Sequence, residues 1–565
     1  MIKFTKCDVA ASIIAVISLT ISIVTLSIFP SFYSKMVVEN LQMSQHEDGS
    51  PTFSTFMYAN PPMKNIMKFF FFNITNPDEM IYFSAKPRLV ETLAYTVIET
   101  EHKRYLKFSE DKEKLFYQNY KRFTISKEYS CQQCSWDDIV TIPNPTGIGA
   151  AGAIYDPQYA ITPVAQKILA FGLLLVGEYP FISHTVKEVL FDGYNDALLD
   201  IGHSKFLAFI SGIVNGGKSI LPIPIPDMPL LGYFQGYNNS RDEEYWVKTG
   251  KSEINEIGNI LTWGNHSLLP DYWWTTEYAR SIRGSDSGSF CKMNLDKTDR
   301  LPFFQSYMCR SFTKIFLNET IVHNIPSYMF AVPYEDYDTT SDLNAGFRYR
   351  NVEKVNYYPD WPLCPGRNHS LCIDGQQLDC SLQENLCHAC CNGSFVNGTY
   401  LLPPGMYPMV CYPGRLQPTP FAVMYSPPHF LYSPQTVIDS VVGLNPNNET
   451  HSPMIYSHEP YSGTITGVFY RLMVSMPTMP IKSTPQNAHL PKSIIPIFWQ
   501  SSDAKLYDYT YRKLWLGFVF VPKFVMFLEY FLLTLGIFML IFVATCQFLR
   551  RRSTKLITPK NIVAF

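Results

Sequence analysis

The chain has 565 residues, a formal net charge of −2 and 15% aromatic residues. This nearly balanced charge excludes the strongly basic surface typical of nucleic-acid binding and gives no reason to expect a polyanionic partner. The 41 prolines, many in Pro-Pro or Pro-x-Pro contexts, favour short strands joined by rigid turns over long helices. A β-rich body is therefore expected, as one large domain or as two or three ordinary ones, because no linker divides it.

The N-terminal region contains an uncharged apolar run from Val9 to Phe29. The apolar part of a signal peptide has about 7–15 residues and ends in small residues, whereas this run is longer and ends in Phe29-Pro30. We therefore expect an uncleaved transmembrane helix over residues 9–30. Two lysines precede it, which predicts that residues 1–8 are cytosolic.

A second membrane segment is predicted over residues 516–549, with its core at 524–548. The part of this core from Tyr530 to Phe548 carries no charge and, at about 1.5 Å per helical residue, nearly crosses a bilayer core of ~30 Å. Three arginines follow at once and resist translocation, so residues 550–565 are expected to be a cytosolic tail. Residues 31–515 are then an ectodomain.

Sequons and cysteines indicate that this ectodomain lies in an oxidising, glycosylating compartment. Asn-x-Ser/Thr sequons occur at Asn73, Asn238, Asn265, Asn318, Asn368, Asn392, Asn397 and Asn448. Ectodomain cysteines occur at Cys131, Cys134, Cys291, Cys309, Cys364, Cys372, Cys380, Cys387, Cys390, Cys391 and Cys411, and the segment 364–391 is a cysteine-rich insertion. The doublets 131/134 and 387/390 also fit zinc knuckles, but the compartment favours disulfides.

Within the ectodomain, Phe69 to Glu79 is typical of a strand and turn, and residues 95–101 and 121–127 of further strands. Between residues 163 and 214 the apolar spacing changes to intervals of three and four, which predicts a helical insertion. Two apolar runs there, 168–176 and 206–214, are too short to span a bilayer. We expect them to be helix-packing core, with a membrane-touching or ligand-capturing apex as the alternative.

Several stretches together resemble the class B scavenger receptor family, which includes the fatty-acid translocase, the high-density-lipoprotein receptor and a lysosomal integral membrane protein. Each motif is weak alone, but their order and the two-anchor topology cover nearly the whole chain. The motifs are Phe72 to Glu79, His184 to Leu190 with Gly193-Tyr194, Thr262 to Asn265, Gly284 to Asp286 with Ser289-Phe290, Cys309 to Ser311, Pro428 to Phe430, Gly443 to Asn447 with Thr464 and Gly467, and Ile495 to Trp499.

The resemblance implies an α+β membrane protein, in which two transmembrane helices flank an ectodomain with an antiparallel β-barrel-like core, a helical apex at 163–214 and an apolar tunnel. Carboxylates outnumber lysines at that apex, so an apolar grip is favoured over an electrostatic one. The ligand-binding residues expected there are Lys167, Phe171, Leu173, Leu174, Leu175, Val176, Phe181 and Lys187.

The resemblance also bears on the cysteines. Cys309 and Cys411 keep family positions and are expected to pair with each other. The cysteine that usually precedes the Gly-Ser-Asp motif is replaced by Ala279, and Cys291 follows the motif instead. Cys291 is expected to bridge to the cluster at 364–391, leaving one unassigned odd thiol.

The function that follows is a receptor without catalytic residues, metal or cofactor. It would bind lipids (fatty acids, sterols or phospholipids) or lipoprotein-like particles at the apex and pass lipid through the tunnel, in the plasma membrane or the endosomal or lysosomal membrane. The alternatives are a sorting receptor for lumenal protein cargo and a two-span ligand-gated channel. An ectoenzyme is not favoured, because no nucleophile-elbow or zinc-protease motif occurs. Cys7 and Cys546, at the cytosolic ends of the spans, are candidates for S-acylation or are unmodified thiols.

Overall fold

The computed structural model describes residues 5–154, 161–202, 229–339, 341–347, 395–396, 399–400, 403–419, 423–481 and 484–557. Two compact units separate within it. The helical unit contains the chain up to residue 42, residues 323–325 and the chain from residue 508, and the β-rich unit contains residues 43–322 and 326–507.

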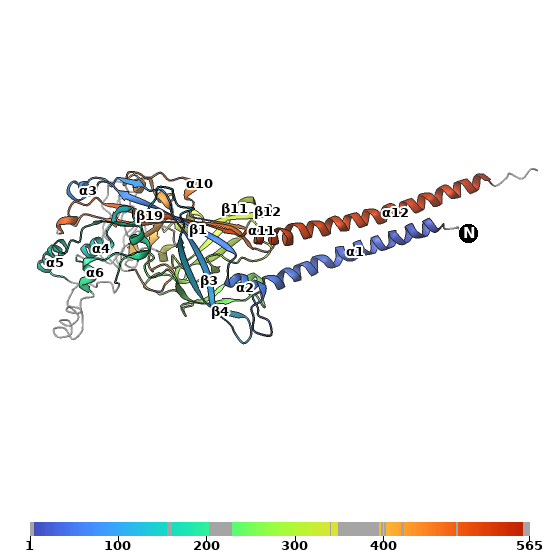
Figure 1. Cartoon of the computed structure of the whole chain (residues 1–565), viewed down its shortest axis with the longest axis horizontal. Coiled ribbons are helices and arrows are strands. Elements are labelled where there is room, and N and C mark those ends of the chain that lie inside the picture. Colours follow the sequence, from blue (N-terminus) through green and yellow to red (C-terminus); the bar gives the residue numbers. More distant parts are fainter. Residues whose placement is uncertain are drawn as a thin grey trace, which may run out of the picture. The chain divides into compact units, whose positions relative to one another are not determined.

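The helical unit holds α1 (Lys6–Leu41) and a C-terminal series of α11 (Asp508–Trp515), the π-helical η8 (Leu516–Phe520) and α12 (Val521–Ile557). Both α1 and the C-terminal series are long and apolar enough to cross a membrane, and α1 runs beside α12 (Figure 1). The first helix does not end at Pro30 as expected but continues to Leu41. The lost backbone hydrogen bond is compensated beyond the proline by packing, since Tyr33 is buried and its hydroxyl donates to the Gly517 carbonyl at 2.8 Å.

Small residues form the seam between α1 and α12. Ala11, Ala15, Ser18 and Ser22 are the buried residues of the N-terminal half of α1 after Asp8, at intervals of four, three and four. Opposite them, a Cβ on Gly536 would lie 2.6 Å from a Leu19 side-chain carbon, so only glycine allows this approach. Such residues let transmembrane helices approach closely and gain dispersion energy that apolar bulk alone does not supply. Glu529 is buried in the helical unit, and its backbone carbonyl accepts a hydrogen bond from Ser22 at 2.9 Å.

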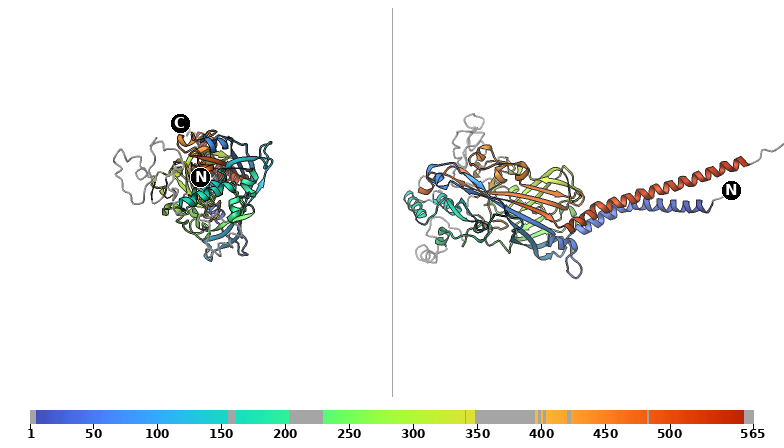
Figure 2. Two further views of the ribbon diagram at one scale, coloured as in Figure 1. Left: turned by 90° about the vertical axis from the view of Figure 1, so that its left-hand side faces the viewer. Right: turned by 45° about the horizontal axis from the view of Figure 1, so that its top comes forward.

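The β-rich unit is built on one large sheet, which confirms the antiparallel β-barrel-like core (Figures 1 and 2). An isolated bridge between Asn259 and Ser285 links the two ends of the strand order, so the sheet is nearly closed. In sheet order the strands are β8 (Ile260–Trp263), β7 (Ser240–Lys248), β4 (Lys114–Ile125), β3 (Tyr95–Phe108), β1 (Met63–Ile74), β19 (Ser493–Leu506), β18 (Ile465–Thr478), β17 (Met454–His458), β12 (Ile325–Ala331), β11 (Arg310–Val322), β10 (Arg300–Gln305) and β9 (Ser285–Asp286).

Shorter elements cover the ends of this sheet. The additional strands are β2 (Leu89–Glu91) on β1, β15 (Tyr407–Pro408) and β16 (Met424–Ser426) beside β18, and the separate pair β13 (Phe395–Val396) and β14 (Thr399–Tyr400). The short helices are α2 (Phe53–Ala59), α3 (Pro77–Phe83), α8 (Glu277–Arg280), α9 (Gln435–Ile438), α10 (Asn448–His451), η3 (Ile254–Glu256), η4 (Tyr334–Tyr337), η5 (Ala345–Phe347), η6 (Pro428–Phe430) and η7 (Pro485–Asn487).

The three strands expected in the first part of the ectodomain are present, but each is longer than expected. The strand expected from Phe69 begins at Met63, the one expected over 95–101 continues to Phe108, and the one expected over 121–127 begins at Lys114. The additional length of β3 and β4 could not be recognised in the sequence, because some of their inward-facing positions carry polar side chains. These side chains break the alternation of apolar and polar residues that marks a strand.

Buried charges account for that polar interior. Lys121 of β4 is almost fully buried and lies 3.5 Å from Glu99 of β3 and 3.9 Å from Asp242 of β7. Lys103 pairs with Glu101 beside them. Burial raises the pKa of Asp242 to about 7, while Glu99 and Asp242 hold the pKa of Lys121 above its usual range although burial alone would lower it. Three neighbouring strands are thus joined inside the sheet by ion pairs.

Replacing Lys121 by methionine is expected to destabilise the β-rich unit, because buried carboxylates lose their partner. The expected loss is about 3–5 kcal/mol in the free energy of unfolding, measured by chemical denaturation. The control is Arg122→Met, since Arg122 is exposed on the same strand and should change stability by about 0.5 kcal/mol or less. Equal stability of the two variants would contradict a structural role for the ion pairs of Lys121 with Glu99 and Asp242.

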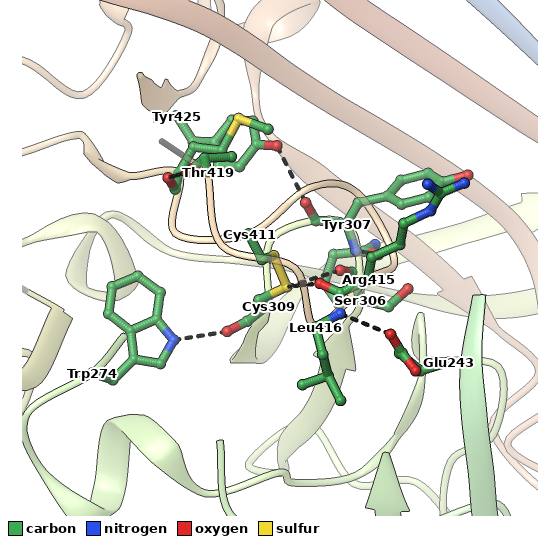
Figure 3. The surroundings of a disulfide bond; sticks show 12 residues. Glu243, Trp274, Ser306, Tyr307, Cys309, Cys411, Arg415, Leu416, Thr419 and Tyr425 are labelled. Atoms are coloured by element: carbon green, nitrogen blue, oxygen red, sulfur yellow. Dashed lines mark hydrogen bonds between the residues drawn. A yellow bond between two sulfur atoms is a disulfide. The ribbon is translucent and has the colours of Figure 1, made fainter. Parts of the chain in front are cut away.

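Two disulfides lie among the described residues, Cys131–Cys134 and Cys309–Cys411, and the second is the pairing that the resemblance implied. Cys309 is fully buried with φ +50°, and its carbonyl accepts a hydrogen bond from the Trp274 indole at 2.8 Å (Figure 3). Because Cys131 and Cys134 are bonded to each other, the zinc-knuckle alternative for these two cysteines is wrong.

The expected bridge from Cys291 to the cysteine cluster is wrong, because Cys291 is a free thiol. Its sulfur lies 3.7 Å from His458, in a polar site that it shares with the buried Lys314. The cysteines of the 364–391 insertion lie outside the described residues. They number six, an even count that lets them pair among themselves without Cys291.

Removal of the Cys309–Cys411 disulfide, as the double serine variant, is expected to lower the free energy of unfolding by about 2–5 kcal/mol, since it closes a loop with a sequence separation of 102. The control is the double serine variant of Cys131–Cys134, whose separation of three constrains the unfolded chain much less. The stability of both double variants is measured by thermal melting. An equal loss of stability in the Cys131/Cys134 variant and the Cys309/Cys411 variant would contradict this expectation.

Candidate functional site at the helical apex

Three helices, α4 (Pro145–Ile154), α5 (Pro163–Leu175) and α6 (Ala197–Gly202), lie together at one end of the β-rich unit (Figures 1 and 2). The antiparallel pair of β5 (Ile139–Pro143) and β6 (Phe181–Thr185) leads into α4 and out of α5. The helical insertion expected over 163–214 therefore starts earlier, at Pro145, and is interrupted by β6, after which the chain is helical again at residues 186–192, which include the π-helical η2 (Glu188–Asp192). Residues 203–228, which include the second apolar run, lie outside the described residues.

Local chemistry fixes both ends of α5. The Thr162 hydroxyl accepts a hydrogen bond from the Ala165 amide, and Pro163 occupies the first helical turn, where its missing N–H costs nothing. The helix ends at Leu175, and Gly177, directly after the C-cap residue Val176, has a φ of +81° that suits glycine. Between these ends, Ala170 and Leu173 are buried, and Leu173 packs against Ala150, Ala151 and Ile154 of α4. The small α4 side chains allow this close helix contact.

The opposite face of α5 is apolar and exposed. Val164, Ile168, Phe171 and Leu175 expose 70%, 66%, 55% and 71% of their surface. Their spacing of four, three and four places them on one side of the helix, which we call the outer stripe. Contiguous apolar side chains exposed to this extent indicate a binding surface, because isolated exposed residues would have no reason to keep the helical period.

The charge around the outer stripe is low. Lys167 is the one charged side chain of α5 and is exposed. Glu178 and Asp196, two of the carboxylates that outnumber the lysines in the apex sequence, are buried and do not face solvent. Lys187 is half-buried and bonded to Asp192 at 2.8 Å, a contact that raises the pKa of its ammonium group. The exposed surface of α5 is therefore apolar, with the single positive charge of Lys167.

The sequence-based selection of binding residues divides into three groups. Lys167, Phe171 and Leu175 are exposed on α5, whereas Leu174 and Val176 are half-buried. Leu173 and Phe181 are buried, Leu173 against α4 and Phe181 in a core that includes Met406 and Phe430, so neither is available at the surface. Val164 and Ile168 were missed, although the spacing of apolar residues at 164, 168, 171 and 175 marks them in the sequence.

Other predicted sites lie away from the apex. Among the five sequons within the described residues, Asn238, Asn265, Asn318 and Asn448 are exposed, and Asn73 is half-buried with its side-chain oxygen bonded to the Thr141 amide at 2.8 Å. Asn368, Asn392 and Asn397 lie outside those residues. In the part of the chain that the structure describes, no cluster of three His, Cys, Asp or Glu side chains is placed to hold a metal ion.

A substitution by serine is expected to affect the free energy of unfolding strongly on the buried face of α5 and weakly on the exposed face. Leu173→Ser removes a buried side chain and is expected to cost about 2–5 kcal/mol in the free energy of unfolding, whereas Ile168→Ser should change it by about 0.5 kcal/mol or less. Thermal melting of the full chain in detergent, with the apex monitored by proteolysis, measures both. A severe loss in Ile168→Ser would mean that the outer stripe is buried in the native protein.

Comparison with known proteins agrees with this architecture. The model of the CD36 family matches residues 11–547. The chain is 41% identical to an uncharacterized protein of Caenorhabditis elegans, with 92% of each chain covered. It is 23% identical to lysosome membrane protein 2 of Rattus norvegicus, covering 85% of this chain and 82% of that one, and 22% identical to scavenger receptor class B member 1 of Sus scrofa, covering 90% and 82%. The sheet, the two apolar terminal helices and the family match together show that the chain is a membrane protein of the CD36 family.

Proposed function

We propose that this protein is a scavenger-receptor-like membrane receptor that captures lipids or lipid-rich particles on the outer stripe of α5 and passes lipid along an apolar path to the membrane. The observation that carries the proposal is the four-residue apolar stripe, exposed on a helix whose other face is already packed. The similarity to a protein named as a class B scavenger receptor supports the receptor role. No catalytic step is required.

The energetics of capture favour an apolar ligand. Fully burying a Val, Leu, Ile or Phe side chain is worth about 1.5–3 kcal/mol, so covering four half-exposed side chains contributes several kcal/mol. That is of the order of millimolar to micromolar affinity before ordering costs are subtracted. A fatty acid, sterol or phospholipid acyl chain offers such a surface, as does a lipoprotein-like particle, and Lys167 can contact an anionic head group beside the stripe.

The same proposal assigns the topology. Both chain ends are cytosolic, the β-rich unit is external or lumenal and carries glycans at the exposed sequons, and the location is the plasma membrane or the endosomal or lysosomal membrane. Cys7, which is exposed, and Cys546, which is half-buried, are the S-acylation candidates near the cytosolic ends of the two helices. Glycosidase treatment of sealed microsomes tests the orientation, because only lumenal sequons acquire protected glycans.

A lumenal protein cargo is the second candidate occupant of the apex. The outer stripe has the geometry of an amphipathic helix that fits an apolar groove on a protein, with anchors at intervals of three and four. The similarity to a protein named as a lysosome membrane protein supports a lysosomal location, in which lumenal proteins would be available as cargo.

Vesicle binding tests the lipid proposal. Full-length protein in nanodiscs is mixed with phosphatidylcholine vesicles containing a fluorescent fatty acid, and association and transfer are measured. Ile168→Ser/Leu175→Ser is expected to weaken association about tenfold or more, equivalent to about 1.4 kcal/mol. The matched control Leu317→Ser/Ile321→Ser alters two exposed apolar residues of β11 and should leave association unchanged.

Wild-type-like association of the stripe variant would contradict capture by α5. Absence of association in the wild type, together with one-to-one capture of a purified lumenal protein, would favour protein cargo instead.

A further inference from the structure

Two buried carboxyl groups lie where α5 ends and α6 begins. Glu178 follows α5 and is 3% exposed, and Asp196 precedes α6 and is 7% exposed. Within the described ranges, no lysine, arginine or histidine side chain forms an ion pair with either group. Buried carboxylates are normally paired with a cation, so this pair needs another explanation.

Hydrogen bonds place the two carboxyl groups side by side. The Leu198 amide donates to Glu178 Oε1 at 3.2 Å and to Asp196 Oδ1 at 3.1 Å, so one N–H is shared by both side chains. Asp196 Oδ1 also accepts from the Leu199 amide at 3.1 Å, which makes Asp196 the cap of α6. Together the two side chains hold the first turn of α6 at the end of α5.

The same carboxyl groups reach the start of α4. Asn144, directly before α4, donates from Nδ2 to Glu178 Oε2 at 3.1 Å and to the Tyr179 carbonyl at 2.9 Å. The Thr146 hydroxyl in the first turn of α4 bonds to Asp196 Oδ2. The approach is close, because a Cβ on Gly147 would lie 2.5 Å from the Tyr179 carbonyl oxygen. All three apex helices therefore meet at Glu178 and Asp196.

Among the described residues, Tyr194 and Gln486 also contact the pair and are uncharged near neutral pH. Tyr194 faces both carboxyl groups, and its pKa is raised well above the usual value by burial and by the two carboxyl charges, so it stays neutral. Gln486 donates to the Glu178 backbone carbonyl at 3.2 Å and is uncharged. His184 stacks on the Tyr194 ring at a centroid distance of 4.0 Å and lies 3.5 Å from Glu188.

We propose that Glu178 and Asp196 form a proton-dependent clasp that fixes α6 to α5 and α4 and thereby regulates the binding apex. With one proton shared between them, a carboxylic acid and a carboxylate satisfy the surrounding donors. When both are ionised, two like charges face each other in a dry site and the first turn of α6 is released. The regulatory meaning rests on the proposed function of α5, but the clasp itself does not.

The pH window follows from Glu178. Burial, and then the neighbouring Asp196, raise the pKa of Glu178 to about 7. The native apex therefore binds more protons than the unfolded chain between the ordinary glutamate pKa of about 4.5 and about 7, so its stability falls as pH rises through this window. Above about pH 7 the loss is complete. The clasp is closed in mildly acidic surroundings and open in neutral to alkaline ones.

Hydrogen exchange of the full-length protein in nanodiscs tests the clasp without any ligand. Exchange at pH 5.5 and pH 8 is corrected for the intrinsic pH dependence of amide exchange, and protection is compared for the peptide containing residues 196–202. The wild type is expected to lose about tenfold or more of its protection at pH 8, since one pKa unit corresponds to a factor of ten. Glu178→Gln, which carries no titratable proton, should show equal protection at both pH values.

Two further variants complete the design. Asp196→Asn retains a capping side chain and removes the repulsion between the two charges, so it should weaken the pH dependence to the part that burial of Glu178 alone causes. A weakened dependence in this variant is the readout if Glu178→Gln fails to melt cooperatively. Glu188→Gln changes an apex carboxylate outside the pair and should keep the wild-type profile. Equal wild-type protection at both pH values, or an unchanged loss in Glu178→Gln, would overturn the proposal. Because no vesicle and no fatty acid is added, either result is independent of vesicle binding.

Discussion

The architecture depends on the antiparallel pairing of β1 with β19, the first and last long strands of the β-rich unit. Their register runs from Met63 opposite Leu506 to Phe71 opposite Phe498, so the two ends of this unit lie side by side although they are more than 400 residues apart in sequence. Phe69, Phe71 and Phe498 from these strands pack against one another inside the sheet. This pairing joins the N-terminal and C-terminal strands of the sheet, and α11 begins directly after β19, so the chain continues from it into its second apolar helix.

Much of this fold could be predicted from the sequence. The two apolar runs, the β-rich body and the family motifs all agree with the structure, and the family match leaves the two-span ligand-gated channel without support. The full lengths of β3 and β4 could not be predicted, because the missed parts of these strands carry the buried polar residues Lys103 and Asn119. Lys103 forms an ion pair with Glu101, and Asn119 donates a hydrogen bond to Asp242. A periodicity analysis recognises a buried position by its apolar side chain and cannot recognise one filled by an ion pair.

The candidate site shows the same limit on a smaller scale. The run from Ile168 to Val176 located α5 correctly, but a continuous apolar run does not say which residues face outward. The structure assigns Leu173 to the α4 contact and leaves Ile168 and Leu175 exposed. The apex carboxylates illustrate the other half of the problem: from sequence they read as surface charges, whereas Glu178 and Asp196 are buried partners of α6. Because both side chains are buried, they add no negative charge to the apex surface and instead hold the first turn of α6 at the end of α5.

The most direct measurement is photochemical labelling of the full-length protein in nanodiscs with a diazirine-bearing fatty acid, followed by peptide mapping. If the outer stripe is the capture surface, labelling at low probe concentration concentrates on the α5 peptide that contains Ile168, Phe171 and Leu175, and excess unlabelled fatty acid competes it away. Labelling spread over the exposed sheet surface, or α5 labelling that competitor does not reduce, would contradict lipid capture at the apex.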